Sequence, residues 1–169
     1  MAEQPCPQTI AITEEILSPF VKPGDTAVDI GCGGGFFSAG LAELVGTTGK
    51  VISVDLQPEM LEYTRAYAEK RGVIDRITLH QCTSDSLKLE GTRANFVLAF
   101  YVVHEIPDHE SLFKQVRDVL LPDGKFLIVE PNGHVKPNEF AAMIEVAQKA
   151  GFKPVETVKV LFSRGVVLG

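Results

Sequence analysis

The chain has 169 residues and a mass of 18.4 kDa, close to the usual size of one compact domain. Hydrophobic residues make up 45% and charged residues 22%, which disfavours intrinsic disorder, collagen-like repeats and coiled coil. A net charge of −6 disfavours a nucleic-acid partner, and we interpret the basic residues of one predicted helix and its flank as a solvated face. These residues are Arg65, Lys70, Arg71 and Arg76.

Short apolar or β-branched runs alternate with helical patterns along the chain, which predicts an α/β fold. Strands are expected at 26–30, 51–55, 77–80, 95–100 and 125–129. Helices are expected at 37–45, 58–71, 110–121 and 137–150, after a short helical segment within residues 1–24 that carries Ile12, Ile16, Leu17 and Phe20. Five strand-then-helix units imply a parallel sheet with helices on both faces, because a parallel neighbour requires a long right-handed crossover.

The C-terminal tail departs from this alternation. Residues 155–161 and 166–168 are strand-like, but only the four residues 162–165 separate them, too few for a crossover. We expect an antiparallel hairpin at one edge. The predicted fold is therefore one doubly wound domain over residues 1–169, with a seven-stranded, mostly parallel sheet that ends in an antiparallel hairpin.

The cysteines and the N-terminus indicate the cellular compartment. Cys6, Cys32 and Cys82 are odd in number and have no CxxC spacing, which argues against a disulfide framework or a zinc site, so we expect no metal. The first residues lack the features of a signal peptide, and the longest apolar stretch, 96–103, is less than half a membrane span. We expect a cytoplasmic protein without membrane insertion.

The glycine-rich segment after the first strand is the strongest functional signal. Four of the five residues 31–35 are glycine, at the carboxyl end of a strand and before a helix, where such sheets bind ligands. A nicotinamide dinucleotide loop requires a third glycine or alanine where this chain has Phe36. A phosphate-binding P-loop is excluded because no Lys-Ser or Lys-Thr follows the glycines.

The pattern acid-x-Gly-x-Gly-x-Gly, filled by Asp29, Gly31, Gly33 and Gly35, resembles the class I S-adenosylmethionine-dependent methyltransferases. The resemblance extends over nearly the whole chain. It implies a Rossmann-like fold, S-adenosyl-L-methionine as cofactor and S-adenosyl-L-homocysteine as product. It also implies methyl transfer by in-line displacement, for which no universal catalytic residue is required.

The same resemblance assigns roles to individual residues. Asp55 would accept both ribose hydroxyls, although it could also cap the helix near Pro58, and Leu56 would pack against adenine. Cys32 would be a small packing residue of the loop. Relatives often carry Gly-Asp-Ala after the third strand, where this chain has Cys82-Thr83-Ser84, so either Thr83 or Asp85 would contact adenine. The implied cofactor-binding set is Asp29, Gly31, Cys32, Gly33, Gly35, Asp55, Leu56, Thr83, Ser84 and Phe100.

The residues that face the methyl acceptor are expected in the loop after the fourth strand. A general base helps where the acceptor is a hydroxyl or an ammonium, and Tyr101, His104 and Glu105 are the candidates. His134, after the fifth strand, faces the same end of the predicted sheet. His104 could instead be a loop histidine bonded to backbone.

We expect a methyltransferase that acts on a small-molecule acceptor and forms a possible homodimer. Two alternatives stay open: a non-catalytic S-adenosylmethionine-binding subunit or sensor, and, third, an NAD(P)-binding oxidoreductase. The sequence does not identify the acceptor, because one fold supports many reactions.

Overall fold

The computed structural model describes residues 7–169, and their side chains from residue 12 onward. Cys6 of the sequence prediction lies outside the described residues. The chain forms two compact units, of which the first ends at Gln81 and the second begins at Cys82. Among the described residues, no helix combines the length and the apolar character needed to cross a bilayer.

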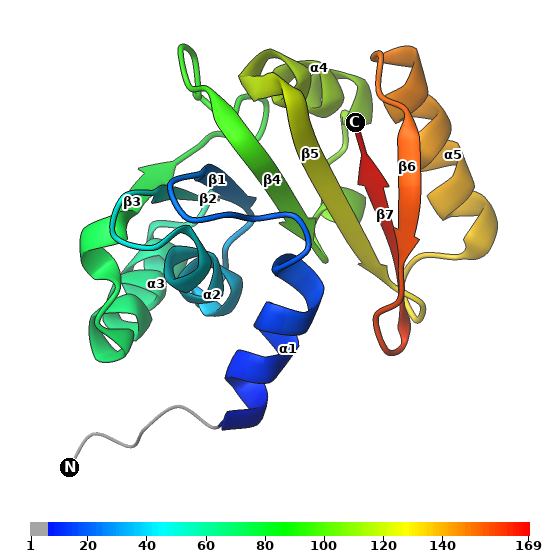
Figure 1. Ribbon diagram of the computed structural model, residues 1–169. Helices are drawn as coiled ribbons and strands as arrows, with labels where there is room; N and C mark the ends of the chain where they lie inside the picture. The colour runs from blue at the N-terminus through cyan, green and yellow to red at the C-terminus, as the bar shows by residue number, and fades with distance from the viewer. Residues whose placement is uncertain (1–6) are drawn as a thin grey trace. The chain divides into compact units, whose positions relative to one another are not determined.

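The first unit consists of a three-stranded parallel sheet and its helices. Its elements are α1 (Pro7–Leu17), β1 (Thr26–Ile30), α2 (Phe36–Val45), β2 (Lys50–Asp55), α3 (Pro58–Arg71), the short 3-10 helix η1 (Ile74–Arg76) and β3 (Ile77–Gln81). β2 lies between β1 and β3 and pairs in parallel with both. α2 and α3 pack side by side and contact this sheet (Figure 1). The predicted N-terminal helix is present, but Phe20 lies beyond its end.

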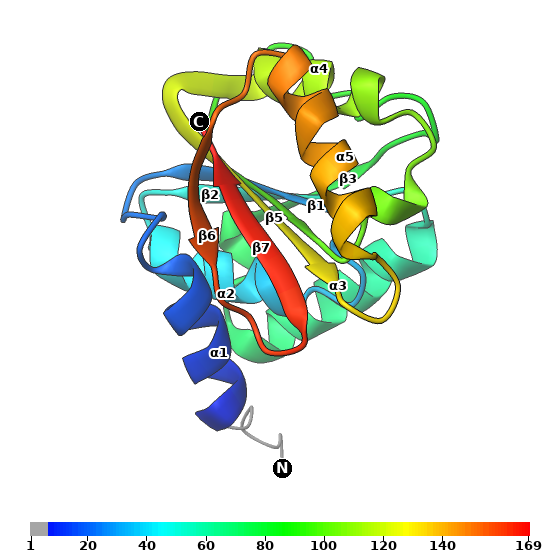
Figure 2. The same ribbon diagram turned by 90° about the vertical axis from the view of Figure 1, so that its right-hand side faces the viewer.

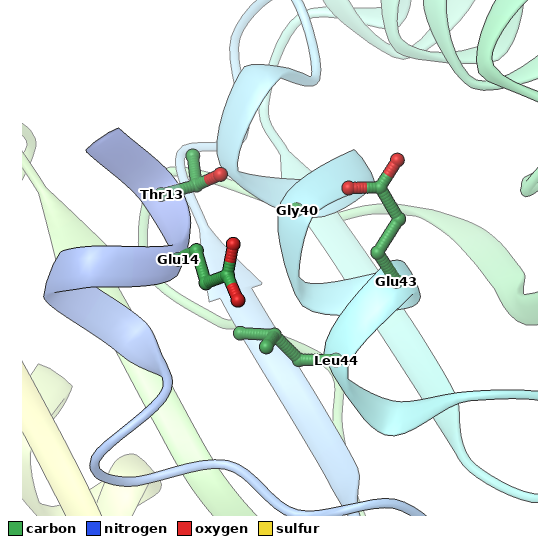
Figure 3. A pocket seen from close by; sticks show the side chains of 5 residues that line it. All are labelled: Thr13, Glu14, Gly40, Glu43 and Leu44. Atoms are coloured by element: carbon green, nitrogen blue, oxygen red, sulfur yellow. The ribbon is translucent and has the colours of Figure 1, made fainter. Parts of the chain in front are cut away.

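Small residues set the distance between α1 and α2. A Cβ on Gly40 would lie 2.7 Å from the Cβ of Thr13, so only glycine permits this approach of the two helices. A cavity of about 200 Å³ opens beside the contact, lined by Thr13 and Glu14 of α1 and by Gly40, Glu43 and Leu44 of α2 (Figure 3). It lies between two helices and not at the carboxyl ends of the strands, where α/β sheets bind their ligands.

The second unit combines parallel and antiparallel strands. Its elements are β4 (Ala94–Phe100), the 3-10 helix η2 (Val103–Glu105), α4 (His109–Val119), β5 (Leu120–Pro131), α5 (Pro137–Lys149), β6 (Pro154–Val158) and β7 (Ser163–Leu168). β4 pairs in parallel with β5, and β7 lies between β5 and β6, antiparallel to both (Figure 2). The predicted fold class is thus confirmed as a seven-stranded, mostly parallel sheet with antiparallel C-terminal strands.

Three aromatic rings form the centre of the second unit's core. Phe113 of α4, Phe126 of β5 and Phe152 are each fully buried. Their ring centroids lie 5.7 to 6.4 Å apart, mostly in edge-on arrangements, which is the favourable geometry for aromatic pairs. Phe113 lies within the helix expected at 110–121, whereas Phe152 lies just after α5, outside every expected helix and strand.

Two expectations about connections are wrong. The third strand-then-helix unit does not exist, because residues 82–93, between β3 and β4, contain no helix. The connection expected between the helix at 110–121 and the strand at 125–129 lies within β5, which begins at Leu120. Ala94 pairs with Leu120 and Phe96 with Lys125, so residues 121–124 form a bulge opposite Asn95.

The hairpin turn and one basic residue also require correction. Ser163 and Arg164 belong to β7, and the connection is 159–162 instead of 162–165. Arg71 is not solvated: its side chain is only 4% exposed, and its guanidinium donates to Glu43 of α2. The predicted basic face is therefore partly a contact between α2 and α3.

Candidate functional site

The glycine loop is attached to β2 through its backbone. The amides of Gly31 and Cys32 donate to the carbonyl of Val54, at 2.8 and 3.0 Å. Gly31, Gly33 and Gly35 all have positive φ angles, of 68°, 52° and 84°. This alternation makes the loop turn sharply between β1 and α2, in a backbone conformation that glycine adopts without strain.

Gly33 is fixed from two sides. Its amide donates to Asp55 Oδ2 at 3.0 Å, and its carbonyl accepts from the Thr64 hydroxyl of α3 at 2.8 Å. A Cβ on Gly33 or Gly34 would meet no atom within 4 Å, so open space lies beside both residues. A rigid backbone next to open space is the arrangement needed to hold a ligand closely.

Gly35 permits close packing beside the loop, and its expected part in cofactor binding stays a prediction. A Cβ at this position would lie 2.7 Å from Thr64 Cα, so the third glycine allows α3 to pack against the loop. α2 begins at Phe36 without a side-chain cap. Within its first turn, the Ala39 amide donates to the Gly35 carbonyl at 2.9 Å.

Asp55 ends β2 and organises the segment that follows it. It is 8% exposed; Oδ2 accepts from Gly33, and Oδ1 accepts from the Gln57 amide at 2.9 Å. Each carboxylate oxygen has two lone pairs, so both keep capacity for a hydroxyl donor. The expected binding and capping roles are compatible. Leu56, expected against adenine, is 51% exposed.

Asp29 lies beneath the loop in a chain of hydrogen bonds. Ser53 donates to the Ser38 hydroxyl at 2.7 Å, and Ser38 donates to Asp29 Oδ2 at 2.6 Å. Burial raises the pKa of the Asp29 carboxyl to about 7, with the charge of Asp55 acting in the same direction and the Ser38 bond against it. Asp29 therefore bonds the end of β1 to α2, which follows the loop, and is itself buried at 2% exposure.

Cys32 behaves as the predicted packing residue. It is buried, and its Sγ lies 3.4 Å from Thr64 Oγ1. Burial, together with the charge of Asp29, raises the pKa of the Cys32 thiol to about 12. The thiolate needed for nucleophilic chemistry is thus disfavoured.

In the second unit, the loop after β3 contains the residues expected to contact adenine. The Thr83 amide and hydroxyl both donate to the Ser86 carbonyl, at 2.9 and 3.3 Å. Asp85 and Ser84 are exposed, and the Asp85 carbonyl accepts from Gln115 of α4 at 3.2 Å. Thr83 and Asp85 both remain candidates for the adenine contact.

A histidine–carboxylate pair lies after β4 and was only partly predicted. His104 Nδ1 lies 2.5 Å from Glu130 Oε2, and Glu130 Oε1 accepts from the amides of Val103 and His104 at 2.9 and 3.3 Å. Glu130 is completely buried, whereas the His104 side chain is 22% exposed. The His104 ring is therefore held by the Glu130 side chain. The alternative expectation, a loop histidine bonded to backbone, did not include this contact.

His134 packs against this pair, and Tyr101 begins the loop that carries His104. The rings of His104 and His134 are T-shaped, with centroids 5.8 Å apart. Tyr101 has a φ of 60°, packs on Phe100 at 4.4 Å between centroids, and shares a hydrogen bond with the Ser163 hydroxyl. A left-handed tyrosine is strained, and such strain occurs preferentially at functional sites. Glu105 is exposed.

Sequence reasoning missed the polar residues that support the site. Ser38, Ser53, Thr64 and Glu130 are each fully buried and hydrogen-bonded. A polar residue inside an otherwise apolar strand or helix pattern is the signal that could have identified them, because buried polar groups need partners.

Comparison with known proteins identifies a matching family model and similar sequences. A family model described as a methyltransferase domain matches residues 21–160. The chain is 33% identical over 119 residues to the demethylmenaquinone methyltransferase of Lactobacillus johnsonii, covering 69% of this chain and 48% of the relative. It is 29% identical over 110 residues to a ubiquinone/menaquinone biosynthesis C-methyltransferase of Haemophilus ducreyi, covering 65% and 42%. The chain spans about half the length of these curated relatives.

A solved structure extends the similarity to the whole chain. The crystal structure of a SAM-dependent methyltransferase from Aquifex aeolicus has a TM-score of 0.84 to this protein, at 23% identity, and the match covers 98% of this chain and 93% of that one. This comparison shows the fold.

Replacement of Asp55 should weaken cofactor binding. Asp55→Ala would remove the two charge-assisted hydrogen bonds expected to the ribose, so we expect the Kd for S-adenosylhomocysteine, measured by calorimetric titration, to rise about ten- to a thousandfold. Because Asp55 also holds the amides of Gly33 and Gln57, the apoprotein should lose about 1–3 kcal/mol of stability. Glu59→Gln, a neutralisation in the exposed first turn of α3, is the control and should leave the Kd unchanged. An unchanged Kd in Asp55→Ala would show that the ribose is held elsewhere.

Asp29 should make stability depend on pH. Its pKa is about 7 in the folded chain and about 3.9 in an unfolded one. Between these values the folded state binds a proton that the unfolded state has released, so the free energy of unfolding falls as pH rises from about 4 to about 7, then stays level. We expect Asp29→Asn to remove this contribution, of up to about 4 kcal/mol, in urea unfolding at a series of pH values.

Ser38→Ala is the companion variant for this measurement. It removes the hydrogen bond that lowers the pKa of Asp29, so the fall in stability should extend to higher pH. If wild type and Asp29→Asn differ by the same free energy at acidic and at neutral pH, the assignment to Asp29 is wrong.

Proposed function

The chain belongs to the class I S-adenosylmethionine-dependent methyltransferase family, and on that premise we propose that it transfers a methyl group from S-adenosylmethionine to a small-molecule acceptor. The observation that carries the proposal is the fixed backbone of Gly33, held by Asp55 and Thr64, beside space that no side chain fills. The residues present fit the cofactor: an aspartate suits a ribose diol, and a fixed glycine backbone beside open space suits a closely held ligand.

When bound, S-adenosylmethionine supplies a methyl carbon on a sulfonium, a good leaving group, to an acceptor lone pair that approaches in line with the carbon–sulfur bond. The protein has to bind, orient and exclude water. We assign the ribose to Asp55, the adenine face to Leu56 and the adenine edge to Thr83 or Asp85. Ser84 and Phe100 complete the proposed binding set.

His104 is the proposed general base. Its Nδ1 is engaged by Glu130, so Nε2 is the nitrogen left to accept a proton from the acceptor. The buried Glu130 fixes the ring and the adjacent backbone through the same carboxylate. Tyr101 is the second candidate, because its hydroxyl is exposed and positioned by Ser163.

The relatives and the charge support a small-molecule acceptor. One curated relative is named a demethylmenaquinone methyltransferase and the other a ubiquinone/menaquinone biosynthesis C-methyltransferase. A net charge of −6 disfavours an RNA acceptor. Assembly as a homodimer and location in the cytoplasm stay predictions.

The proposal is tested by titration and turnover. We expect S-adenosylhomocysteine to bind more tightly than NAD or ATP in calorimetry, and radiolabelled S-adenosylmethionine to transfer its methyl group to a member of a pool of phenolic and quinol acceptors. Tighter binding of NAD would restore the oxidoreductase alternative. Cofactor binding without transfer to any acceptor would favour the non-catalytic subunit or sensor.

His104→Ala should separate binding from chemistry. The proposed cofactor contacts lie mainly in the loops after β1, β2 and β3, so affinity for S-adenosylhomocysteine should stay nearly intact. Turnover should fall by about a hundredfold or more, and one limb of the pH–rate profile should disappear, because the proton acceptor is lost. His109→Gln is the control, since His109 Nε2 donates only to the Val103 carbonyl at 2.9 Å and glutamine also has a donor. Unchanged turnover in His104→Ala would remove His104 from the mechanism.

A further inference from the structure

The free end of the β6–β7 hairpin exposes two large apolar side chains. Leu161 and Phe162 are 79% and 78% exposed, more than any other large hydrophobic residue in the described part of the chain. The Ser163 amide donates to the Val160 carbonyl at 3.0 Å, which closes a tight turn around them. Phe162 occupies the turn position with a φ of 58°, where glycine or asparagine is normally favoured. A bulky ring is thus kept in solvent on a strained backbone.

The loop after β5 adjoins this turn. The Asn132 amide donates to the Phe162 carbonyl at 2.9 Å, and the Arg164 guanidinium donates to the Val135 carbonyl at 2.7 Å. We call residues 159–164 together with residues 132–136 the hairpin tip. Figure 1 shows the turn and this loop side by side at one end of β5 and β7.

The hairpin tip is basic, in contrast to the whole chain. It contains Lys136, Lys159 and Arg164 and no acidic residue, whereas the chain carries a net charge of −6. Lys136 and Lys159 are exposed. Exposed apolar side chains flanked by cations form a surface that fits the interface of a negatively charged bilayer.

We propose that the hairpin tip docks this protein on the surface of anionic lipid bilayers. Two side chains on a turn offer an apolar area well below the roughly 800 Å² per partner that a stable protein interface buries. A second copy of the chain is therefore a less suitable partner for the hairpin tip than a bilayer. Insertion of two side chains with electrostatic attraction from three cations gives weak, reversible binding that falls as salt increases.

The position of the hairpin tip connects docking to the acceptor, and this step rests on the proposed function. Ser163, which follows Phe162, bonds to the Tyr101 hydroxyl, and His134 lies in the same loop as Lys136 with its ring against His104. An acceptor with a polar ring and a long apolar tail could present its ring to His104 while its tail stays in the bilayer. The geometry thus indicates an amphipathic acceptor.

The test is flotation of the full chain with phosphatidylcholine vesicles that contain or lack phosphatidylserine. We expect wild type to bind the anionic vesicles and to be released by salt. The double variant Leu161→Asp/Phe162→Asp should lose about tenfold or more in vesicle affinity, as should Lys136→Glu/Lys159→Glu. Matched controls are Tyr63→Asp and Lys70→Glu on α3, which make the same kinds of change at exposed positions and should bind like wild type.

Several results would overturn the docking proposal. They are equal binding to both kinds of vesicle, no binding to either, and wild-type binding by the double tip variant. Concentration-dependent self-association that the tip variant abolishes, without vesicle binding, would assign the tip to a second copy. Circular dichroism and the Kd for S-adenosylhomocysteine should be unchanged in the tip variants, which verifies their folding.

The two proposals fail in distinguishable ways. Methyl transfer to a water-soluble acceptor without vesicle binding would reject docking and keep the proposed function. Vesicle binding without transfer to any acceptor would reject the proposed function and keep docking.

Discussion

The hydrogen bonds of Gly33 are the constraint on which the cofactor side of this protein depends. One residue without a side chain links the end of β2, through Asp55, to the middle of α3, through Thr64. Strand, loop and helix are therefore held together before any ligand arrives. A loop ordered in advance gives up little further conformational entropy on binding, which favours affinity. The same bonds explain why Gly35 has to be small: α3 can reach Gly33 only by passing within van der Waals contact of Gly35.

Beneath the loop, Asp29 introduces an electrostatic cost that a ligand can relieve. Its carboxyl is fully buried with one serine donor, and burial outweighs that bond, so the pKa is raised to about 7. A positive charge bound at the loop would favour the ionised form, and linkage then requires that binding releases protons near neutral pH.

The features that could be predicted from the sequence are those with local signals. The glycine loop, β1 and α3 match their predicted ranges because strand periodicity, Pro58 and Gly72 all act within a few residues. The missed features depend on partners distant in the chain: Thr64 bonds to Gly33 and Glu130 to Val103. The hairpin turn was misplaced for the same reason. The predicted connection 162–165 included Gly165, but Gly165 pairs with Val129 of β5, and a Cβ there would lie 2.8 Å from the Val158 carbonyl. Glycine at this position permits close strand packing, so the turn moves to Leu161 and Phe162.

Both units use a carboxylate near the end of a strand to hold the backbone of a loop, but they expose it differently. Asp55 accepts the amides of Gly33 and Gln57, and the ribose hydroxyls would bind to the same carboxylate. Glu130 accepts the amides of Val103 and His104 but is completely buried, and the exposed group is the His104 ring bonded to it. A carboxylate that meets its ligand directly is suited to binding, because it accepts hydrogen bonds without exchanging protons. A carboxylate that acts through an imidazole is suited to proton transfer, because the ring can gain a proton at one nitrogen while the other stays bonded. Under the proposed function, the group in front of each acid would thus separate cofactor binding from proton transfer.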